Sequence, residues 1–415
     1  MLYASSLRRL AGVTQVVSAA EGSVFHNRLT HSLQVAQIAR RLAQRLVKDH
    51  PSLSARLGGL DPDVAETAAL CHDLGHPPFG HVAEEELDRL VVAAGDSDGF
   101  EGNAQSLRIV TKLSVRHKDF PGLNLTRASL NAILKYPWFR MGTGKRHRKW
   151  GAYRTERREF LWARRGLRPQ ARTLEAQVMD AADDIAFSVH DVEDFFRAGL
   201  IPLDRLLSDR GGVQLDRLAE AVFQRRRTDK RPLTVGGRRI SQSTFRSSLE
   251  RLLSWFPLTE PFRGSRNERA LLRAFTSTLI SNYIQDHRLE RPTGAGDALV
   301  LRRDYEIEIV VLKELVFHYV IHNPALATQQ LGHKAAVRHL FSEFLHGTTH
   351  NADLLPSHCR DDLTMIERLP SRDRRRARAR LVADTIASMS ERQIVLLHNR
   401  LRGIDPGSIF DLIGR

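Results

Sequence analysis

Residues 71–84 have the sequence Cys71-His72-Asp73-Leu74-Gly75-His76-Pro77-Pro78-Phe79-Gly80-His81-Val82-Ala83-Glu84. Because Gly75 and the pair Pro77-Pro78 do not continue a helix, we expect one helix to end near His72 and another to begin after a shaped loop. An adjacent His and Asp at a helix end offer an imidazole nitrogen and a carboxylate oxygen, which are both ligands for divalent metals. The stretch therefore predicts a metal site carried by helices.

Helical periodicity continues on both sides of this stretch. Apolar residues recur at helical spacing between His31 and Val47, and Asp61-Pro62 is typical of an N-cap followed by the first helical position. A long helix is expected to run from Thr173 to Arg197. Further helices are expected over residues 82–93, 103–113, 126–135, 265–288, 304–321, 333–346 and 375–400, and alternating strand patterns are scarce. The fold class predicted from these patterns is all-α.

The composition is that of a soluble globular protein. The chain has 415 residues, of which 42% are hydrophobic and 27% are charged, so it can bury a large core. Its two cysteines, Cys71 and Cys359, exclude a disulfide scaffold and a four-cysteine zinc module. We find no apolar run of about 18 residues and no signal-peptide pattern at the N-terminus. We therefore expect a cytoplasmic protein with no membrane partner.

Basic residues outnumber acidic ones. The chain contains 63 Lys and Arg against 48 Asp and Glu, a formal net charge of +15, which favours anionic partners. Three segments concentrate this charge: 140–172, 225–239 and 372–380 have twelve, seven and six basic residues against two, one and one acidic residues. The first two are predicted to be loops and the third the first turns of a helix. Each is interpreted either as a solvated surface or as a footprint for nucleic acid or a triphosphate.

Two further regions carry residues that could complete the metal site. His31 lies at the start of one predicted helix, and Asp183-Asp184 lie within the long helix that begins near Thr173. That long helix is apolar on both sides of the pair, and an ionised carboxylate on a buried face is costly unless it is paired or metal-bound. Three helices could thus bring His31, His72-Asp73 and one of the two aspartates to a single divalent ion.

This pattern resembles the H…HD…D signature of the HD phosphohydrolase superfamily. The chain is most similar to its bacterial dGTPase branch, the deoxyguanosinetriphosphate triphosphohydrolase-like proteins, and the similarity is densest over residues 5–200. The motifs that carry the resemblance are Leu7-Arg8-Arg9-Leu10, Thr14-Gln15, Arg28-Leu29-Thr30-His31, His72-Asp73-Leu74-Gly75-His76-Pro77-Pro78-Phe79-Gly80-His81, Phe100-Glu101-Gly102-Asn103, Leu174-Glu175-Ala176-Gln177, Ala182-Asp183-Asp184-Ile185-Ala186, Leu312-Lys313-Glu314 and Ala383-Asp384-Thr385.

The resemblance implies an HD-domain helical core with a helical C-terminal extension. It also implies a reaction in which water attacks the α-phosphorus of a dNTP and releases a deoxynucleoside and inorganic triphosphate. The implied metal ligands are His31, His72, Asp73 and Asp183. By ligand type this set suits Mn²⁺, Fe²⁺, Co²⁺, Ni²⁺ or Zn²⁺, whereas Mg²⁺ is harder and suits it less, although assays of the family commonly use it. The expected ion is therefore Mn²⁺ or Mg²⁺.

The loop after the metal pair carries the implied catalytic residues. His81 is expected to transfer a proton near the α-phosphate, as base, acid or nucleophile. Glu84, three residues later on the same helix face, is expected to orient His81. His76 is grouped with them, as a residue that contacts phosphate.

Four residues are implied to bind the substrate. Arg28 is expected to contact a phosphate, whereas Gln15 and Asp191 are expected to contact the 3′-hydroxyl of the deoxyribose. Asp191 lies two helical turns after Asp183, on a similar face. For Asn103, substrate binding and helix capping remain equally open.

The domain organisation follows the resemblance. Residues 1–200 are expected to form the phosphohydrolase core, and residues 201–415 a helical region that completes the substrate pocket and supplies oligomer contacts. A homo-oligomer is implied, with single-stranded DNA or a nucleotide as a further effector. Two features depart from the family: Phe187 stands where a Tyr is common, and the chain begins almost inside its first motif, which leaves the completeness of the N-terminus open.

Two other functions are compatible with the sequence. One is an HD phosphohydrolase that acts on another nucleotide phosphoester. The other is a nucleic-acid-binding regulator with a degenerate site, a hypothesis that rests on the basic segments. Release of triphosphate would separate the first alternative from the dNTP hydrolase, and salt-dependent binding of single strands would test the second.

Overall fold

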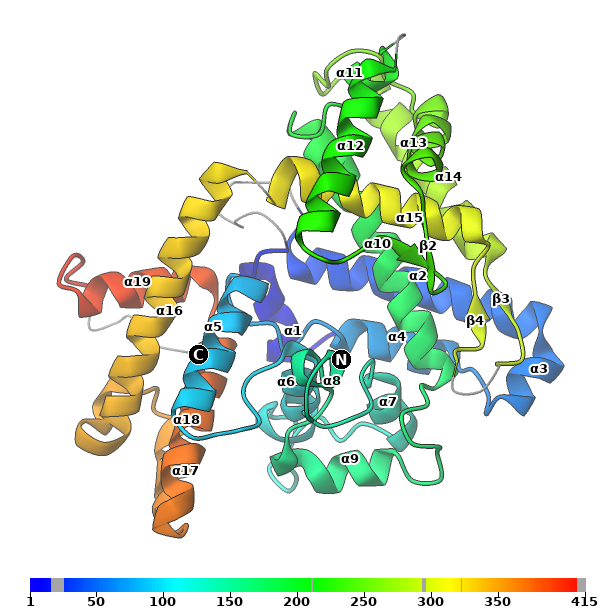
Figure 1. The fold of residues 1–415 in the computed structure, drawn as a ribbon. Helices are drawn as coiled ribbons and strands as arrows, with labels where there is room; N and C mark the ends of the chain where they lie inside the picture. Colours follow the sequence, from blue (N-terminus) through cyan, green and yellow to red (C-terminus); the bar gives the residue numbers. More distant parts are fainter. Residues whose placement is uncertain (16–25, 210–211, 293–295, 322, 409–415) are drawn as a thin grey trace.

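The computed structural model describes residues 1–15, 26–209, 212–292, 296–321 and 323–408. Within these residues the protein is built from nineteen α-helices, and its strands form only two short antiparallel pairs (Figure 1). This confirms the predicted all-α class. Among the described residues, no single helix is both long and apolar enough to cross a membrane; only the bent pair Arg303–Ile321 and Pro324–His350, which meet at 77°, reaches that length and composition together.

The α-helices are α1 (Ser5–Arg9), α2 (Arg28–Asp49), α3 (Pro51–Arg56), α4 (Pro62–Cys71), α5 (His81–Ala93), α6 (Gly102–Arg108), α7 (Arg127–Ala132), α8 (Lys145–Arg148), α9 (Arg157–Ala163), α10 (Leu174–Arg197), α11 (Leu203–Leu207), α12 (Val213–Thr228), α13 (Gln242–Trp255), α14 (Arg266–Asp286), α15 (Arg303–Val316), α16 (Pro324–His350), α17 (Cys359–Glu367), α18 (Ser371–Ser388) and α19 (Glu391–Leu401). The strands are β1 (Thr234–Val235), β2 (Arg238–Arg239), β3 (Arg288–Leu289) and β4 (Leu299–Val300), paired β1 with β2 and β3 with β4.

Side-chain caps fix the starts of the three helices that carry the site. Asn27, Asp61 and Thr173 cap α2, α4 and α10, because each side chain accepts a hydrogen bond from a backbone N–H of the first turn. The predicted cap at Asp61 and the predicted start of the long helix at Thr173 are confirmed. The three helices pack against one another, and α10 also packs against α15, at the centre of the fold (Figure 1). Their apolar faces belong to one hydrophobic cluster that reaches from Leu7 to Val320.

A second hydrophobic cluster joins α5 to the C-terminal helices. Phe79 and the inner face of α5 pack with residues of α16, α17, α18 and α19, on the left of Figure 1. The helix that begins at His81 therefore has one end at the predicted site and one face in the C-terminal region. The division of the chain at residue 200 stays a prediction.

Several predicted element boundaries are wrong. The helix expected over 375–400 is two helices, because Ser390 caps a new helix through a capping box with Gln393. The helix expected over 126–135 ends at Ala132, and the one expected over 103–113 passes into a π-helix, η3 (Ile109–Leu113). The helix expected over 333–346 is longer, because Asn323 caps it at Pro324 and it continues to His350.

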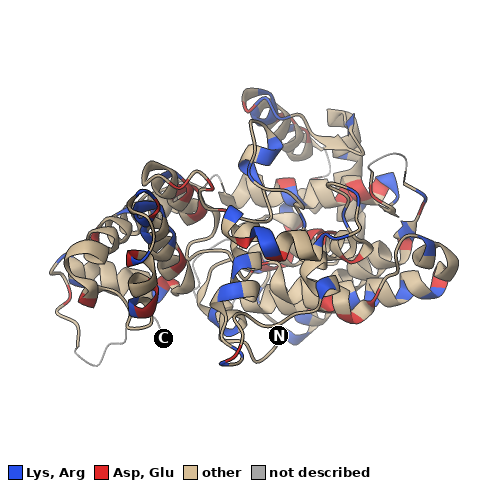
Figure 2. Ribbon diagram, turned by 90° about the horizontal axis from the view of Figure 1, so that it is seen from below, with Lys and Arg blue, Asp and Glu red and all other residues tan. Residues whose placement is uncertain are grey.

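Part of the basic charge is neutralised inside the fold. Residues 225–239 are not simply a loop, because α12 extends to Thr228, where Arg225 and Arg226 contact the buried carboxylate of Glu314. Residues 372–380 form the first turns of α18, as predicted, and the buried Arg380 donates to Asp96 Oδ2 at 2.6 Å. Figure 2 shows that positions of Asp and Glu are interspersed with those of Lys and Arg along the ribbon.

Candidate metal and nucleotide site

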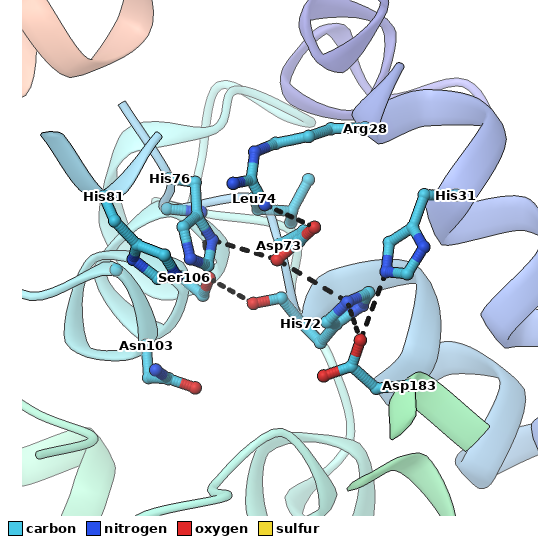
Figure 3. Close-up of polar contacts among 12 residues, drawn as sticks. Arg28, His31, His72, Asp73, Leu74, His76, His81, Asn103, Ser106 and Asp183 are labelled. Carbon is cyan, nitrogen blue, oxygen red and sulfur yellow. Dashed lines mark hydrogen bonds and ion pairs between the residues drawn. The ribbon is translucent and has the colours of Figure 1, made fainter. Parts of the chain in front are cut away.

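Three helices bring together three of the four predicted metal ligands. His31 lies in the first turn of α2, His72 follows the last residue of α4, and Asp183 lies in the middle of α10. One ligand atom from each residue lies within 4.8 Å of the other two. Asp183 Oδ1 lies 3.1 Å from His31 Nε2 and 3.6 Å from His72 Nε2, so both imidazoles face one carboxylate oxygen (Figure 3).

Asp73 lies beside this group, between it and the loop. Its Oδ1 atom is 3.5 Å from His72 Nε2 and 2.9 Å from His76 Nδ1, and its Oδ2 atom accepts a hydrogen bond from Arg28 Nη1 at 2.7 Å (Figure 3). Burial favours the neutral acid, but Arg28, His72 and His76 hold the pKa of Asp73 well below its usual range. Asp73 is therefore an ionised oxygen donor next to the three converging ligands.

The donor set fits a divalent cation. His72 Nδ1 lies 2.6 Å from the carbonyl oxygen of Ala69, which orients the ring so that Nε2 points toward the carboxylates, and this Nε2 is buried without a hydrogen-bond partner. Burial lowers the pKa of His72, but Asp73 and Asp183 outweigh it and raise the value to about 9. Two carboxylates thus attract a positive charge to this position, and a metal ion can supply that charge in place of the proton.

Two other groups of potential ligands in the described part of the chain already have cationic partners. In the first, His76, His81 and Glu84, the Lys149 ammonium lies 2.8 Å from Glu84 Oε1. In the second, Asp180, Asp183 and Asp184, Lys135 lies 2.5 Å from Asp180, and Lys313 lies 2.6 Å from Asp184. In the group formed by His31, His72 and Asp183, Lys135 faces only the Oδ2 atom of Asp183, at 3.3 Å, which leaves Oδ1 and the two imidazoles for a metal ion and makes this group the better candidate.

Asp183 and Asp184 face different surroundings. Asp183 directs Oδ1 to the two histidines and Oδ2 to Lys135, 3.3 Å away. Burial opposes ionisation, but Lys135 and His72 hold the pKa of Asp183 well below its usual range. Asp184 contacts Lys313 instead, and burial raises its pKa. This arrangement favours Asp183 as the ligand.

The loop ends at a histidine that is oriented by a buried acid. His81 is the first residue of α5, and its Nδ1 lies 2.6 Å from Glu84 Oε2. The His81 side chain is 68% exposed, whereas that of Glu84 is 8% exposed. Burial opposes ionisation of Glu84, but His81 and Lys149 keep its pKa well below the usual range. The expected pairing of the two residues on one helix face is thus present.

His76 has a different environment from His81. It is buried, its Nδ1 faces Asp73, and burial together with the neighbouring Arg28 lowers its pKa to about 4. At neutral pH it is an uncharged imidazole beside the site. The loop itself rests on α6, where a Cβ atom at Gly75 would lie 2.0 Å from the Gly102 carbonyl oxygen, so only glycine fits.

A cavity of about 660 Å³ opens beside the candidate ligands. Of the predicted substrate residues, Gln15, Arg28 and Asn103 line it, as do His72, Asp73, His76, His81, Asp183 and Phe187. Gln15 Oε1 and Arg28 Nε are buried without a hydrogen-bond partner, so both have unused capacity for a ligand.

Asp191 and Asn103 differ from the other predicted substrate residues. Asp191 is not among the lining residues; it is buried on α10 with Oδ2 unpaired, and burial and Asp194 raise its pKa well above the usual range. Capping by Asn103, one of the two roles considered for it, is not observed, because Glu101 caps α6 and Asn103 instead donates to Glu101 Oε1 at 2.8 Å. The Asn103 side chain lies at the edge of the site in Figure 3.

Four lysines that the sequence analysis did not single out line the same cavity. They are Lys135, Lys149, Lys313 and Lys334, which with Arg28 make five basic side chains around it. Lys149 lies in the basic segment 140–172 and Lys313 in the motif Leu312-Lys313-Glu314, so each had a sequence signal without an assigned role. Lys135 and Lys334 had no such sequence signal, because no local sequence pattern indicates which lysine side chains will face a cavity after the helices pack.

The comparisons with known proteins agree with this geometry. Residues 28–188 match the HD domain and residues 299–400 match the phosphohydrolase-associated domain. The helical fold and the His–Asp cluster are thus those of an HD-domain phosphohydrolase.

Three relatives define the branch. The chain is 36% identical to a deoxyguanosinetriphosphate triphosphohydrolase-like protein of Corynebacterium efficiens, over 97% of this chain and 90% of the relative. It is 37% identical to a protein of that description from Streptomyces coelicolor, over 97% and 91%. A third, from a Caulobacter species, is 45% identical over 50% and 48%. The chain belongs to the family of deoxyguanosinetriphosphate triphosphohydrolase-like proteins, as its motifs indicated.

Proposed function

We propose that the protein is a metal-dependent dNTP triphosphohydrolase, which converts a deoxynucleoside triphosphate and water into a deoxynucleoside and inorganic triphosphate. One observation carries the proposal: the convergence of His31, His72 and Asp183, next to Asp73, at the wall of a cavity lined by five basic side chains. A mixed nitrogen and oxygen donor set beside clustered cations suits a polyphosphate ester. The names of the relatives point to the same substrate class.

His31, His72, Asp73 and Asp183 would hold the metal ion. When bound, a divalent ion supplies charge neutralisation at a phosphate oxygen and lowers the pKa of a coordinated water. Mn²⁺ and Mg²⁺ are the first ions to test, and Fe²⁺, Co²⁺, Ni²⁺ and Zn²⁺ share the ligand preferences of the site.

The side chains around the metal ligands have separate tasks in this proposal. Arg28, whose Nη1 binds Asp73, directs its remaining guanidinium donors to the phosphates, and Lys135, Lys149 and Lys313 add positive charge for the triphosphate. Gln15 binds the 3′-hydroxyl of the sugar through its unpaired amide oxygen, and Asp191 binds the same hydroxyl. Phe187 adds an apolar wall without a hydroxyl group.

The chemical step forms a bond between the oxygen of water and the α-phosphorus and breaks the bond from that phosphorus to the 5′ oxygen. His81 moves the proton, taking it from the attacking water and delivering it to the departing 5′ oxygen. Glu84 holds the His81 ring in position through the 2.6 Å contact. His76, uncharged at neutral pH, contacts phosphate.

The test is to incubate the full chain with each of the four dNTPs and Mn²⁺ or Mg²⁺ and to identify the phosphate product. Inorganic triphosphate is expected, together with the deoxynucleoside. Release of only phosphate or pyrophosphate would replace this proposal with a different phosphoester hydrolase. The homo-oligomer, the cytoplasmic location and a single-stranded DNA or nucleotide effector stay predictions.

A further inference from the structure

The turn that precedes His81 contains a strained backbone residue. Phe79 has a φ angle of 66°, in the left-handed region that bulky side chains rarely adopt. It is followed by Gly80 and then by His81, so its conformation sets the direction in which α5 begins. Such strain persists only where surrounding contacts hold it in place. The contacts that hold Phe79 therefore control where His81 points.

The main contact comes from the first residue of α19. Glu391 is buried, and its Oε1 atom accepts hydrogen bonds from the backbone N–H groups of Phe79, at 3.0 Å, and Thr14, at 2.8 Å. Its Oε2 atom accepts a third, from the Thr14 hydroxyl, at 2.6 Å. One carboxylate thus links the Phe79 turn to the segment that carries Gln15, although these segments are separated from Glu391 by more than 300 residues of sequence.

Two further residues hold the same loop. The ring of His333, on α16, stacks on the ring of Phe79 with centroids 3.9 Å apart and an interplanar angle of 10°. On the other side, Arg9 donates hydrogen bonds to the carbonyl oxygens of Leu74 and His76, both at 2.8 Å. The loop is therefore held between the N-terminal helix and the C-terminal region, and Glu391 also binds Thr14, which precedes Gln15.

We propose that Glu391 is a positioning residue, through which the C-terminal region fixes both His81 and Gln15 for catalysis. Both of its carboxylate oxygens are occupied by hydrogen bonds from Thr14 and Phe79, so it acts through these residues and not on the substrate. Without its carboxylate, two buried N–H groups lose their acceptor, and the Phe79 turn can relax. The roles of His81 and Gln15 in this inference rest on the proposed function.

Four variants separate positioning from general stabilisation. Glu391→Ala removes all three hydrogen bonds. Glu391→Gln keeps an amide oxygen for the two N–H groups, and its NH₂ group can donate to the Thr14 hydroxyl, so it is the rescue variant. Glu391→Asp keeps the charge but draws it back by one methylene. Asp384→Asn is the matched control, because Asp384 is a buried carboxylate on α18 whose hydrogen bonds come from Gln105, at 2.8 Å, and Arg108, at 2.9 Å, and not from the Phe79 turn or Thr14.

Two measurements are made on the full chain: kcat for triphosphate release with Mn²⁺ and dGTP, and amide hydrogen exchange of residues 76–82. We expect Glu391→Ala to lower kcat by about 100-fold and to speed exchange in residues 76–82, whereas Glu391→Gln restores most of both. Glu391→Asp is expected to fall between them. Asp384→Asn should leave the exchange of residues 76–82 as in the wild type.

Three results would overturn the inference. The first is a kcat and an exchange rate in Glu391→Ala equal to those of the wild type, and the second is equally fast exchange of residues 76–82 in Asp384→Asn. The third is a higher kcat in Glu391→Asp than in Glu391→Gln, because the charge of residue 391 would then matter more than its position. If Glu391→Ala does not fold, the kcat values of the other two variants decide: a higher kcat in Glu391→Gln than in Glu391→Asp supports the inference, and the reverse overturns it. A wild-type protein that releases no triphosphate contradicts the proposed function alone, because the exchange measurement still reports whether Glu391 holds the turn.

Discussion

The Nδ1 atom of the exposed His81 lies 2.6 Å from the Oε2 atom of the buried Glu84, one helical turn away. A largely exposed imidazole is thus held by an acid that solvent hardly reaches, and the acid is held in turn by Lys149. This relationship gives His81 a fixed orientation at the mouth of the cavity without burying the ring.

Glu84→Gln should therefore affect catalysis more than binding. The amide keeps the shape of the side chain but loses the carboxylate that holds the His81 ring through Nδ1, so kcat is expected to fall by about 100-fold or more with little change in KM. The control is Asp88→Asn on the same helix, where the carboxylate pairs with Arg140 at 2.7 Å. Steady-state kinetics of both variants provide the comparison; an unchanged kcat in Glu84→Gln would remove Glu84 from the mechanism.

Asp183→Ala should release the metal. The substitution removes the oxygen that faces both His31 and His72, and affinity for Mn²⁺ is expected to fall by about 100-fold. Asp184→Asn is the matched control, since Asp184 contacts Lys313 instead. Metal content after dialysis distinguishes the two variants. Equal metal loss in both, or none in Asp183→Ala, would contradict the assignment of Asp183.

Asp191→Asn should stabilise the metal-free protein at neutral pH. Burial and Asp194 raise the pKa of Asp191 well above the value in the unfolded chain. As the pH rises through the usual carboxyl range, the unfolded chain releases this proton while the folded chain keeps it, so stability is lost with rising pH. The asparagine variant removes this loss, and we expect a gain of about 1 kcal/mol at pH 8, of the usual size for one substitution, with none near pH 4.

The control for this experiment is Asp194→Asn, one turn later on α10. Asp194 Oδ2 accepts a hydrogen bond from the His26 backbone N–H at 2.8 Å and lies 2.5 Å from His26 Nδ1, so its loss should destabilise the protein. Chemical unfolding in EDTA at both pH values measures the two effects. A destabilised Asp191→Asn at pH 8 would show that the carboxylate has a partner it needs. In the active enzyme, Asp191→Asn should raise KM, because Asp191 is proposed to bind the sugar hydroxyl.

His287 should make the folded protein less stable as the pH falls. The ring is buried at the end of α14, with Nδ1 2.6 Å from the Tyr283 carbonyl oxygen, and burial lowers its pKa to about 4. Between the ordinary pKa of 6.5 and about 4, the unfolded chain binds a proton that the folded chain does not, so stability falls as the pH falls through this window. The shift corresponds to about 3 kcal/mol at most.

The variant His287→Asn can still donate to the Tyr283 carbonyl group but does not titrate. Its free energy of unfolding is expected to depend less on pH between 6.5 and 4 than that of the wild type. His117→Asn, at an exposed position, should leave the slope unchanged. Urea unfolding across this pH range tests the prediction, which is refuted if the wild type and His287→Asn show the same slope.

Much of this protein was determined by the sequence alone. Asp61-Pro62 and Thr173 start helices through contacts within one turn, so local patterns sufficed to predict these helix starts and the residue types of a metal site. His81 and Glu84 were paired correctly for the same reason, since their spacing places them on one helix face.

Tertiary structure decided which of these residues meet and what surrounds them. Asp183 and Asp184 are adjacent in sequence, and only the packing of α10 against α2 and α4 turns the first toward the histidines and the second toward Lys313. Lys135 and Glu391 had no sequence signal at all, because their partners lie 48 and 377 residues away. Local periodicity fixes which face of a helix a side chain occupies, but the neighbour opposite that face depends on how distant helices pack.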